Sequence, residues 1–236
     1  MYFWGNIIPL DKKTAVGTMY GWFAGSKMMR CLLIRSTDRG RSWQFVSMIA
    51  GDDKLTRHGG YGEPSIVRCR DGRLLCVMRT GYAEPRILEQ CWSSDAGETW
   101  TAPIPSPGIR GVGPEDRRYT TPDGRKAEFH SANVSPMLVL LDNGVLAMVY
   151  GRPGIEVAFS LDGTGQKWDK VVEIVPKGAA YSYSNSDVTS GMAGLEAIGN
   201  GQAVLVYDVY EYARNPSDSR RNTIFARVLK IKRSTD

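Results

Sequence analysis

Long apolar runs, paired cysteines and histidine are scarce in this sequence, and each shortage excludes a class of protein. No apolar run approaches the roughly 18 residues that a membrane-spanning helix needs, so we expect no membrane span. The first residues, MYFWGNIIPLDKK, lack the basic, apolar and small-residue order of a signal peptide, which predicts a soluble chain of unspecified location. The four cysteines form no C-x-x-C pair and only two histidines occur, so we predict reduced thiols, no metal site and no cofactor.

The basic residues of the chain are scattered along its 236 residues, although the formal net charge is +5. They form no stripe interleaved with aromatic residues, and this argues against nucleic acid as a partner. Arginine outnumbers lysine. The planar guanidinium group can hold a carboxylate with two hydrogen bonds, so many arginines would suit an acidic sugar. We therefore expect a glycan or oligosaccharide, which can be an acidic one, as the ligand.

The pattern S-x-D-x-G-x-x-W occurs twice, and we call each such segment a box. The two copies read STDRGRSW at 36–43 and SSDAGETW at 93–100, and a longer copy, SLDGTGQKW, occupies 160–168. The Asp side chain accepts backbone N–H bonds, the Gly supplies a positive φ angle, and the Trp packs beneath the turn. Each box therefore predicts a self-contained turn between two strands, with a one-residue bulge in the third copy. The residues given this structural role are Ser36, Asp38, Gly40, Trp43, Ser93, Asp95, Gly97, Trp100, Ser160, Asp162 and Trp168.

Apolar hairpins with D-G or N-G turns accompany the boxes. They occupy 64–79, 136–150 and 194–207, and no box follows the last of them. Each unit then reads as a hairpin, a third strand, a box turn and a fourth strand, which is typical of a β-propeller blade. We therefore predict an all-β fold, with the whole chain as a single propeller domain of about four blades. The blades are expected at about 1–52, 60–106, 130–176 and 186–236.

The boxes, with the hairpin sequences GEPSIVRCRDGRLLCVMRT and NGVLAMVYGRPG, resemble the sialidase superfamily, whose propellers carry bacterial neuraminidase-type (BNR) repeats. The resemblance covers nearly the whole chain. It implies a sialidase-type propeller, of a kind often secreted or periplasmic. Because the family has six blades, the ring here would be partial or shortened. An incomplete ring leaves unpaired sheet faces, which predicts self-association.

Two parts of the sialidase motif set are missing from the sequence. No R-I-P segment, which normally supplies the family's first catalytic arginine, is present. The segment GMAGL at 191–195 places Met192 where the family has its nucleophilic tyrosine. A thioether cannot replace a phenolate in attack on an anomeric carbon, and Tyr181 and Tyr183 are the nearby alternatives.

Propeller geometry brings together the residues just before the first strand and just after the second strand of every blade. This predicts a glycosidase site in which Glu63 and Asp187 are the paired carboxylates and His130 is an alternative base. Arg79 and Arg152 are expected to bind a substrate carboxylate. The remaining predicted substrate-binding residues are Asn133, Tyr207 and Asp208, with Asn6 and Tyr20 at the matching places in the first blade.

The leading functional hypothesis is a sialidase-like glycoside hydrolase acting on acidic or complex glycans. One alternative is a propeller that binds such glycans without catalysis, which Met192 and the short chain favour. A second is a polysaccharide lyase acting on uronates, with His130 or a tyrosine as the base. The two enzymes differ in their products, because β-elimination gives an unsaturated sugar that absorbs ultraviolet light.

Overall fold

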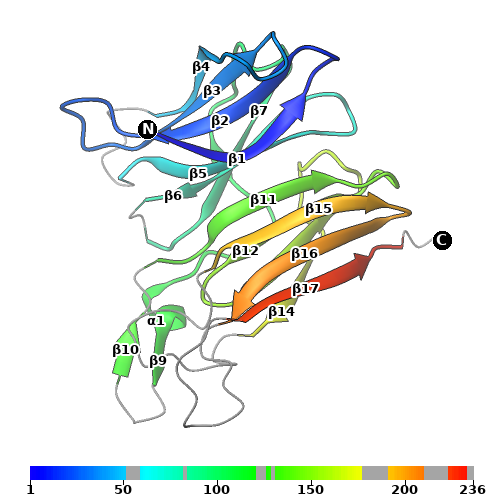
Figure 1. Ribbon diagram of the computed structural model, residues 1–236. Coiled ribbons are helices and arrows are strands. Elements are labelled where there is room, and N and C mark those ends of the chain that lie inside the picture. The colour runs from blue at the N-terminus through cyan, green and yellow to red at the C-terminus, as the bar shows by residue number, and fades with distance from the viewer. Residues whose placement is uncertain are drawn as a thin grey trace.

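The computed structural model describes residues 1–51, 59–81, 84–120, 126–128, 131–176, 191–209 and 223–232. In these ranges the chain forms four antiparallel sheets that follow one another along the sequence and fan out side by side (Figure 1). The all-β propeller class with four blades, which the sequence predicted, is confirmed. Only short elements, the helix α1 (Pro114–Arg117) and the hairpin of β9 (Arg118–Thr120) and β10 (Lys126–Glu128), lie outside the four sheets in the described ranges.

In each sheet the strands pair in chain order. The first sheet contains β1 (Tyr2–Pro9), β2 (Ala15–Gly21), β3 (Arg30–Ser36) and β4 (Gln44–Ala50). The second contains β5 (Tyr61–Arg68), β6 (Leu74–Thr80), β7 (Leu88–Ser93) and β8 (Ile104–Pro105). The third contains β11 (Val134–Leu140), β12 (Leu146–Gly151), β13 (Ile155–Ser160) and β14 (Lys170–Val175). The described part of the fourth contains β15 (Ala193–Gly199), β16 (Gln202–Val209) and β17 (Thr223–Lys230).

The apolar residues of alternate strand positions pack between neighbouring sheets, not around one central core. One cluster joins the first and second sheets through residues such as Leu33 and Ile66, which are fully buried. Two further clusters join the second to the third sheet and the third to the fourth. Burying each such side chain contributes roughly 1.5–3 kcal/mol, so the contacts between blades carry most of the stability. The four cysteines are free thiols buried in this packing.

The box turns contain the hydrogen bonds that close them. In the first copy the backbone N–H of Gly40 donates to Ser36 Oγ (2.8 Å), and the backbone N–H of Ser42 donates to Asp38 Oδ1 (2.9 Å). The second copy repeats both bonds. In the third copy, Gly165, five residues after Ser160, donates to Ser160 Oγ (3.1 Å). The expected one-residue insertion therefore lies between the Ser and the Gly of this turn.

The second and third boxes are not self-contained, which corrects the sequence-based expectation for these two copies. The indole of Trp100 donates from Nε1 to Ser47 Oγ in the first sheet (3.1 Å), and Trp168 donates to Gln90 Oε1 in the second sheet (2.9 Å). A Cβ atom on Gly97 would also come closer than 3.0 Å to Leu33 of the preceding sheet. The second and third boxes thus fasten each blade to the blade before it, because their Trp and Gly sit at the junction.

The strand register relates the box turns to the hairpins. Ser36, Ser93 and Ser160 each pair with the residue that begins the second strand of their sheets, for example Ser93 with Leu74. In the fourth sheet Lys230 pairs with Gln202, the residue that begins β16.

The segment between the second and third sheets is anchored by one buried arginine. Arg117 of α1 is 4% exposed. It donates to both carboxylate oxygens of Glu84 (2.8 Å each) and to Glu128 of β10 (2.9 Å). Such a two-pronged contact fixes α1 and β10 to the loop that follows β6. The described part of the chain has no helix with the length and hydropathy for crossing a membrane.

Candidate functional site

The first strands of the sheets lie close together along the inner side of the fan. Asn6 of β1 donates from Nδ2 to the carbonyl oxygen of Leu138 in β11 (2.6 Å). Thr18 of β2 donates from its hydroxyl to the carbonyl oxygen of Pro64 in β5 (3.2 Å). The strands β1, β5, β11 and β15 begin at the same side of the molecule, on the left of Figure 1. We call this side, where the inner strands begin and the second strands end, the mouth.

Backbone strain is concentrated at the mouth. β1, β5 and β11 each have an irregular register near their start, and Gly5 (φ +83°), Glu63 (φ +52°) and Ser135 (φ +52°) lie there. Asn133 and Arg152 close by also have positive φ values, +49° and +62°. A left-handed backbone at a non-glycine residue costs roughly 1–3 kcal/mol and is kept where surrounding contacts enforce it. Four strained polar residues in one place mark a candidate functional site.

Glu63 is the central charged group of this site and is 7% exposed. Its Oε2 accepts a hydrogen bond from the backbone N–H of Ser135 (2.8 Å) and lies 3.3 Å from the Ser135 hydroxyl. Arg79 Nε lies 3.1 Å from the same oxygen, an ion pair without the alignment of a hydrogen bond. The contacts of Glu63 that join it to Ser135 and Arg79 are therefore all made by Oε2.

A cavity of about 640 Å³ is lined by Ser135, the hydrogen-bond partner of Glu63, although Glu63 itself is not part of its wall. Trp4, Ser135, Met192 and Asp208 are among the side chains that line it. The Ser135 hydroxyl donates to Met192 Sδ (2.8 Å), so Ser135 connects Glu63 with the cavity wall. The indole N–H of Trp4 is buried and has no hydrogen-bond acceptor among the described residues.

Three aromatic rings extend the site toward the first sheet. The ring centroid of Tyr20 lies 5.7 Å from that of Tyr2 and 5.9 Å from that of Trp4. Burial, and next the negative charge of Glu63, raise the pKa of the Tyr20 phenol above its usual value of 10.0. The phenol is therefore neutral at neutral pH and can donate a hydrogen bond.

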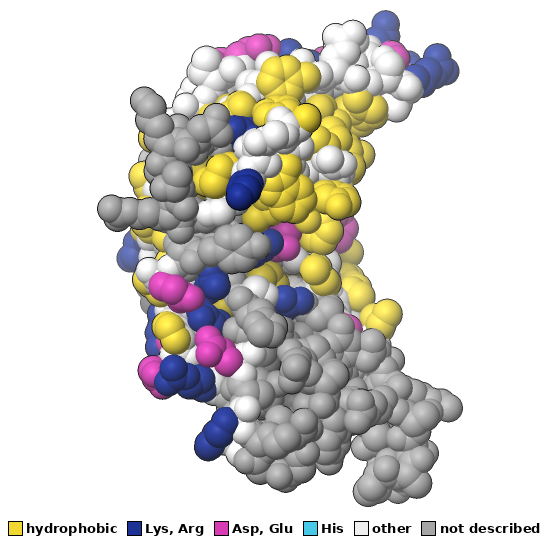
Figure 2. Space-filling view, turned by 90° about the vertical axis from the view of Figure 1, so that its left-hand side faces the viewer, with side chains coloured by type: hydrophobic (Ala, Val, Ile, Leu, Met, Phe, Trp, Pro, Cys, Tyr) yellow, Lys and Arg dark blue, Asp and Glu magenta, His cyan; other side chains and the backbone are white. Residues whose placement is uncertain are grey.

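Hydrophobic side chains gather over the upper part of the face that contains the mouth (Figure 2). Exposed members of the first sheet and of its loop between β2 and β3 contribute to the apolar surface of this part of the chain: Tyr2 is 58% exposed, and Trp22 and Phe23 are 45% exposed. Arg30 lies over the Phe23 ring at 5.1 Å. Apolar and aromatic surface of this kind beside a cavity is typical of a ligand-binding site.

The other predicted arginine and asparagine occupy the edge of the site. Arg152 donates from Nη1 to the hydroxyl of Ser131 and packs against Gly191. Asn133 is 1% exposed and donates from Nδ2 to the carbonyl oxygens of Arg86 and Arg110 (3.0 Å each). The amide of Asn133 therefore holds two loops in place.

The remaining predicted residues are divided between the cavity and the packing of the fourth sheet. Tyr207 lines the cavity but is only 2% exposed; it stacks on Phe225 with 5.7 Å between ring centroids and has Arg227 over its ring. Asp208 lines the cavity. Asp187 and His130 lie outside the described residues, as do Tyr181 and Tyr183. No three His, Cys, Asp or Glu side chains within the described ranges gather as a metal ion would require.

Sequence reasoning missed two residues of the site, Ser135 and Trp4. Ser135 precedes a proline at the start of an inner strand, as Glu63 does, so aligning the repeats would have identified it as the counterpart of Glu63. Trp4 gave no comparable signal, because it lies in the N-terminal strand, where the repeat is weakest.

Comparison with solved structures relates the fold to carbohydrate-active propellers. A protein of unknown function from Dyadobacter fermentans is similar with a TM-score of 0.66 and 15% identity, over 97% of this chain and 53% of that one. The GH93 α-L-arabinofuranosidase of Fusarium graminearum, in complex with arabinobiose, gives 0.64 and 16%, over 95% and 61%. Penicillium chrysogenum α-L-arabinanase, complexed with arabinobiose, gives 0.63 and 18%, over 97% and 62%. The chain thus spans between about half and two thirds of these structures, and the likeness shows the fold.

Sequence comparison identifies the family. No curated protein matches the chain. A family model described as BNR repeat-like domain matches residues 6–195, which is well over half of the sequence. The chain belongs to the BNR repeat-like domain family.

Proposed function

We propose that the protein is a glycoside hydrolase whose site is the mouth, with Glu63 as a catalytic carboxylate. The observation that carries this proposal is the buried Glu63, which has a positive φ angle and contacts Ser135 and Arg79 through one oxygen. Ser135 in turn lines a cavity of about 640 Å³. The propeller neighbours named as an arabinofuranosidase and an arabinanase support a hydrolase on this fold. Similar architecture alone would not be sufficient, because one fold serves many functions.

Glycoside hydrolysis requires one carboxylic acid to protonate the leaving oxygen and a second carboxylate as base or nucleophile. With Oε2 fixed, Glu63 can present Oε1 to the sugar or to a water molecule. Asp208 lines the cavity and is a candidate for the second carboxylate. Asp187 and His130 stay predictions for the same role.

A complex neutral glycan is the first candidate substrate class, because the two arginines expected to bind a substrate carboxylate already contact groups of the protein. Arg79 is opposed by Glu63, and Arg152 contacts Ser131, so both have partners within the protein. The cavity has a mainly apolar wall with Trp4, and an aromatic face suits the C–H side of a sugar ring. Arabinose-containing oligosaccharides, which the neighbours' structures contain, are therefore the first candidates, and sialylated or other acidic glycans are the second.

The deciding experiment compares Glu63→Gln with Glu98→Gln. Glu98 pairs with Arg35 on the outer side of the second box, and its side chain is 55% exposed. Arabino-oligosaccharides and sialylated oligosaccharides are incubated with each protein, and released sugars are measured. Loss of a positioned acid–base group lowers turnover by about 10²–10⁴-fold, which is the expected effect of Glu63→Gln alone. Equal turnover by both variants would reject Glu63 as a catalytic residue.

A non-catalytic glycan-binding role is the second candidate, and Met192 favours it. Its sulfur accepts the Ser135 hydrogen bond at the place where the sialidase pattern has a tyrosine. Binding of either glycan class by calorimetry, without product after long incubation, would support this role over hydrolysis. A lyase acting on uronates would reveal itself in the same incubation by an ultraviolet-absorbing product.

A further inference from the structure

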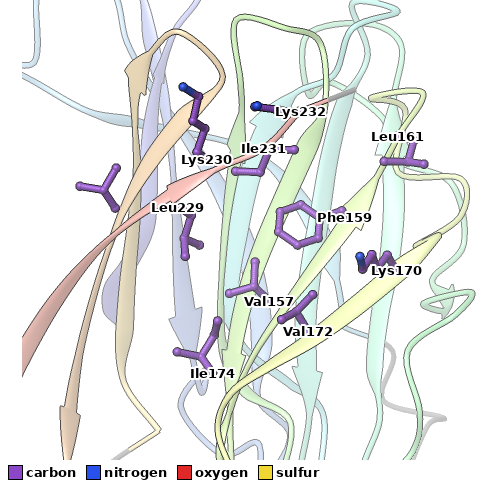
Figure 3. A pocket seen from close by; sticks show the side chains of 11 residues that line it. Val157, Phe159, Leu161, Lys170, Val172, Ile174, Leu229, Lys230, Ile231 and Lys232 are labelled. Carbon is purple, nitrogen blue, oxygen red and sulfur yellow. The ribbon is translucent and has the colours of Figure 1, made fainter. Parts of the chain in front are cut away.

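Two cavities of the described chain differ in the chemistry of their walls. One, of about 420 Å³, lies between β13 and β14 of the third sheet and β17, and apolar side chains and lysines such as Phe159, Val172 and Lys230 line it (Figure 3). None of its described lining residues carries a carboxylate, hydroxyl, thiol or imidazole group. The wall of the cavity at the mouth includes the Ser135 hydroxyl and the Asp208 carboxylate. Of these two walls, the one at the mouth is therefore where a hydroxyl can pass a hydrogen bond from one partner to another.

The Ser135 hydroxyl has two acceptors within reach and one proton to donate. Its Oγ lies 2.8 Å from Met192 Sδ and 3.3 Å from Glu63 Oε2. A serine hydroxyl carries a single O–H, so a well-aligned bond can go to only one of them at a time. Ser135 is 2% exposed, which shields the hydroxyl from bulk water. The sulfur and the carboxylate therefore compete for this proton.

Distance and charge favour different acceptors. The Met192 sulfur is closer, but a thioether is a weak acceptor. Glu63 Oε2 is farther away, but a hydrogen bond to an ionised carboxylate is roughly twice as strong as one between neutral groups. When Glu63 takes up a proton that advantage is lost, and the closer sulfur becomes the better partner. The direction of the Ser135 O–H thus depends on the charge of Glu63.

The surroundings of Glu63 keep their own charge constant in weak acid. Among the described residues Arg79 of β6, Tyr20 of β2 and Cys31 of β3 interact with it. Arginine stays charged, and burial raises the pKa of the Tyr20 phenol above 10.0 and that of the Cys31 thiol well above 9.0. Asp208 of β16 lines the same cavity and can titrate there, so a test has to separate it from Glu63.

We propose that Ser135 and Met192 are positioning residues for Glu63, and that the Ser135 hydroxyl exchanges one acceptor for the other as Glu63 changes charge. It donates to Oε2 while Glu63 is ionised and to Met192 Sδ while Glu63 is protonated; the hydroxyl keeps its proton throughout. Ser135 then stabilises the base form of Glu63, and Met192 favours the acid form. A catalytic carboxyl that gives up a proton and regains it in every turnover needs both forms. The catalytic part of this inference rests on the proposed hydrolase function, whereas the exchange of acceptors does not.

The exchange is tested without any substrate, by NMR of protein labelled with ¹³C-methyl methionine. The Met192 methyl signal, identified by its loss in Met192→Leu, should shift as the pH is lowered from neutral into acid, because the sulfur gains a hydrogen bond. Glu63→Gln and Ser135→Ala should each abolish this shift, and Asp208→Asn should retain it. Met48, which is 39% exposed on β4, is the internal control and should not respond through Glu63.

Three results would overturn the exchange. They are a Met192 signal that does not change with pH, one that still changes in the Ser135→Ala protein, and one whose change disappears in Asp208→Asn. Circular dichroism checks the fold of each variant. If Ser135→Ala does not fold, Glu63→Gln and Asp208→Asn still decide, because they assign the pH response to one carboxyl or the other.

The catalytic consequence is tested by the pH dependence of kcat/KM on a glycan that the wild type hydrolyses. Met192→Leu removes the competing acceptor, so the fall in activity on the acid side should move to lower pH, by about half to one pH unit, which is the effect of one ordinary hydrogen bond. Ser135→Ala should move it to higher pH. The double variant should match Ser135→Ala, because the sulfur acts only through the hydroxyl. Met48→Leu is the matched control and should leave the profile unchanged.

The two measurements separate failure of this inference from failure of the proposed function. A Met192 signal that depends on pH through Glu63 and Ser135, in a protein that hydrolyses neither glycan class, would confirm the exchange and reject the hydrolase. A pH-independent Met192 signal in an active hydrolase would overturn the exchange and leave the role of Glu63 intact. An equal shift of the profile by Met192→Leu with and without the Ser135 hydroxyl would mean that Met192 acts by packing alone.

Discussion

The indole N–H of Trp168 donates to Gln90 Oε1, 2.9 Å away, across the junction of the third and second sheets. Gln90 also donates from Nε2 to the carbonyl oxygen of Gly165 (2.7 Å). Gln90 is completely buried and Trp168 is 2% exposed. One glutamine amide thus satisfies two polar groups of the next blade within a largely apolar interface.

Gln90→Leu should therefore destabilise the protein more than a typical core substitution of similar size. It leaves the indole N–H and the Gly165 carbonyl buried without partners, at about 1–3 kcal/mol each, so we expect a loss of about 2–6 kcal/mol in the free energy of unfolding. Urea denaturation followed by circular dichroism measures this loss. Ser47→Ala is the comparison: it removes the partner of Trp100 Nε1 and the donor to the Gly97 carbonyl, but at a less buried junction, and should cost about 1 kcal/mol. A Gln90→Leu protein as stable as the Ser47→Ala protein would contradict this account.

The box glycines provide a matched pair for testing whether boxes fasten blades together. Gly97 and Gly40 hold the same position in two boxes, with φ values of +92° and +82°. A Cβ at Gly97 would overlap the buried Leu33 side chain, whereas one at Gly40 would meet only Trp43, at 3.9 Å. Both alanine variants bear the strain of a positive φ, but Gly97→Ala adds overpacking of about 1–3 kcal/mol. Thermal unfolding should show the larger decrease in Tm for Gly97→Ala, and equal decreases would mean that the junction is not tightly packed.

Local signals explain why the fold could be predicted from the sequence. A D-G or N-G turn between apolar runs determines a hairpin without reference to the rest of the chain, and Gly72 and Gly144 have the positive φ that such a turn needs. The contacts of Trp100 and Trp168 with the preceding sheet were not predicted. They depend on how two blades meet, and no spacing within a single box encodes that relationship.

The sequence predicted those contacts of the site that lie within one blade, but not the contacts between blades. Glu63 and Arg79 belong to neighbouring strands of one hairpin, where Gly62 pairs with Arg79, so their closeness followed from the hairpin alone. Ser135 reaches Glu63 from another sheet through a positive-φ residue at a register irregularity. Asn133 was expected to bind substrate, but its buried amide donates to two loop carbonyls, a role that no local pattern indicated.

The carboxylates of the box turns should make stability fall in acid. Hydrogen bonds from the hydroxyl and the backbone N–H of Thr99 lower the pKa of Asp95 from 3.8 to about 2. Since the folded-state pKa lies below the unfolded one, the stabilisation is complete above about pH 4 and is lost as pH falls toward 2. Thr99→Val removes the largest cause and should move the Asp95 pKa, followed by carboxyl NMR, back toward 3.8. Thr37→Val, at an exposed position of the first box, is the control and should leave the pKa of Asp38 near 2.

The aromatic wall of the cavity should contribute to glycan binding separately from catalysis. Trp4→Ala removes a ring beside Ser135 and Met192, and we expect a loss of affinity of about tenfold, or about 1.4 kcal/mol. The measurement is calorimetry on the Glu63→Gln background, in which substrate should not be consumed. Phe45→Ala is the control, because Phe45 is 61% exposed on β4 and does not line the cavity. If Trp4→Ala leaves the affinity unchanged while Glu63→Gln still lowers turnover, the sugar binds elsewhere at the mouth. The catalytic role of Glu63 would not be affected by that result.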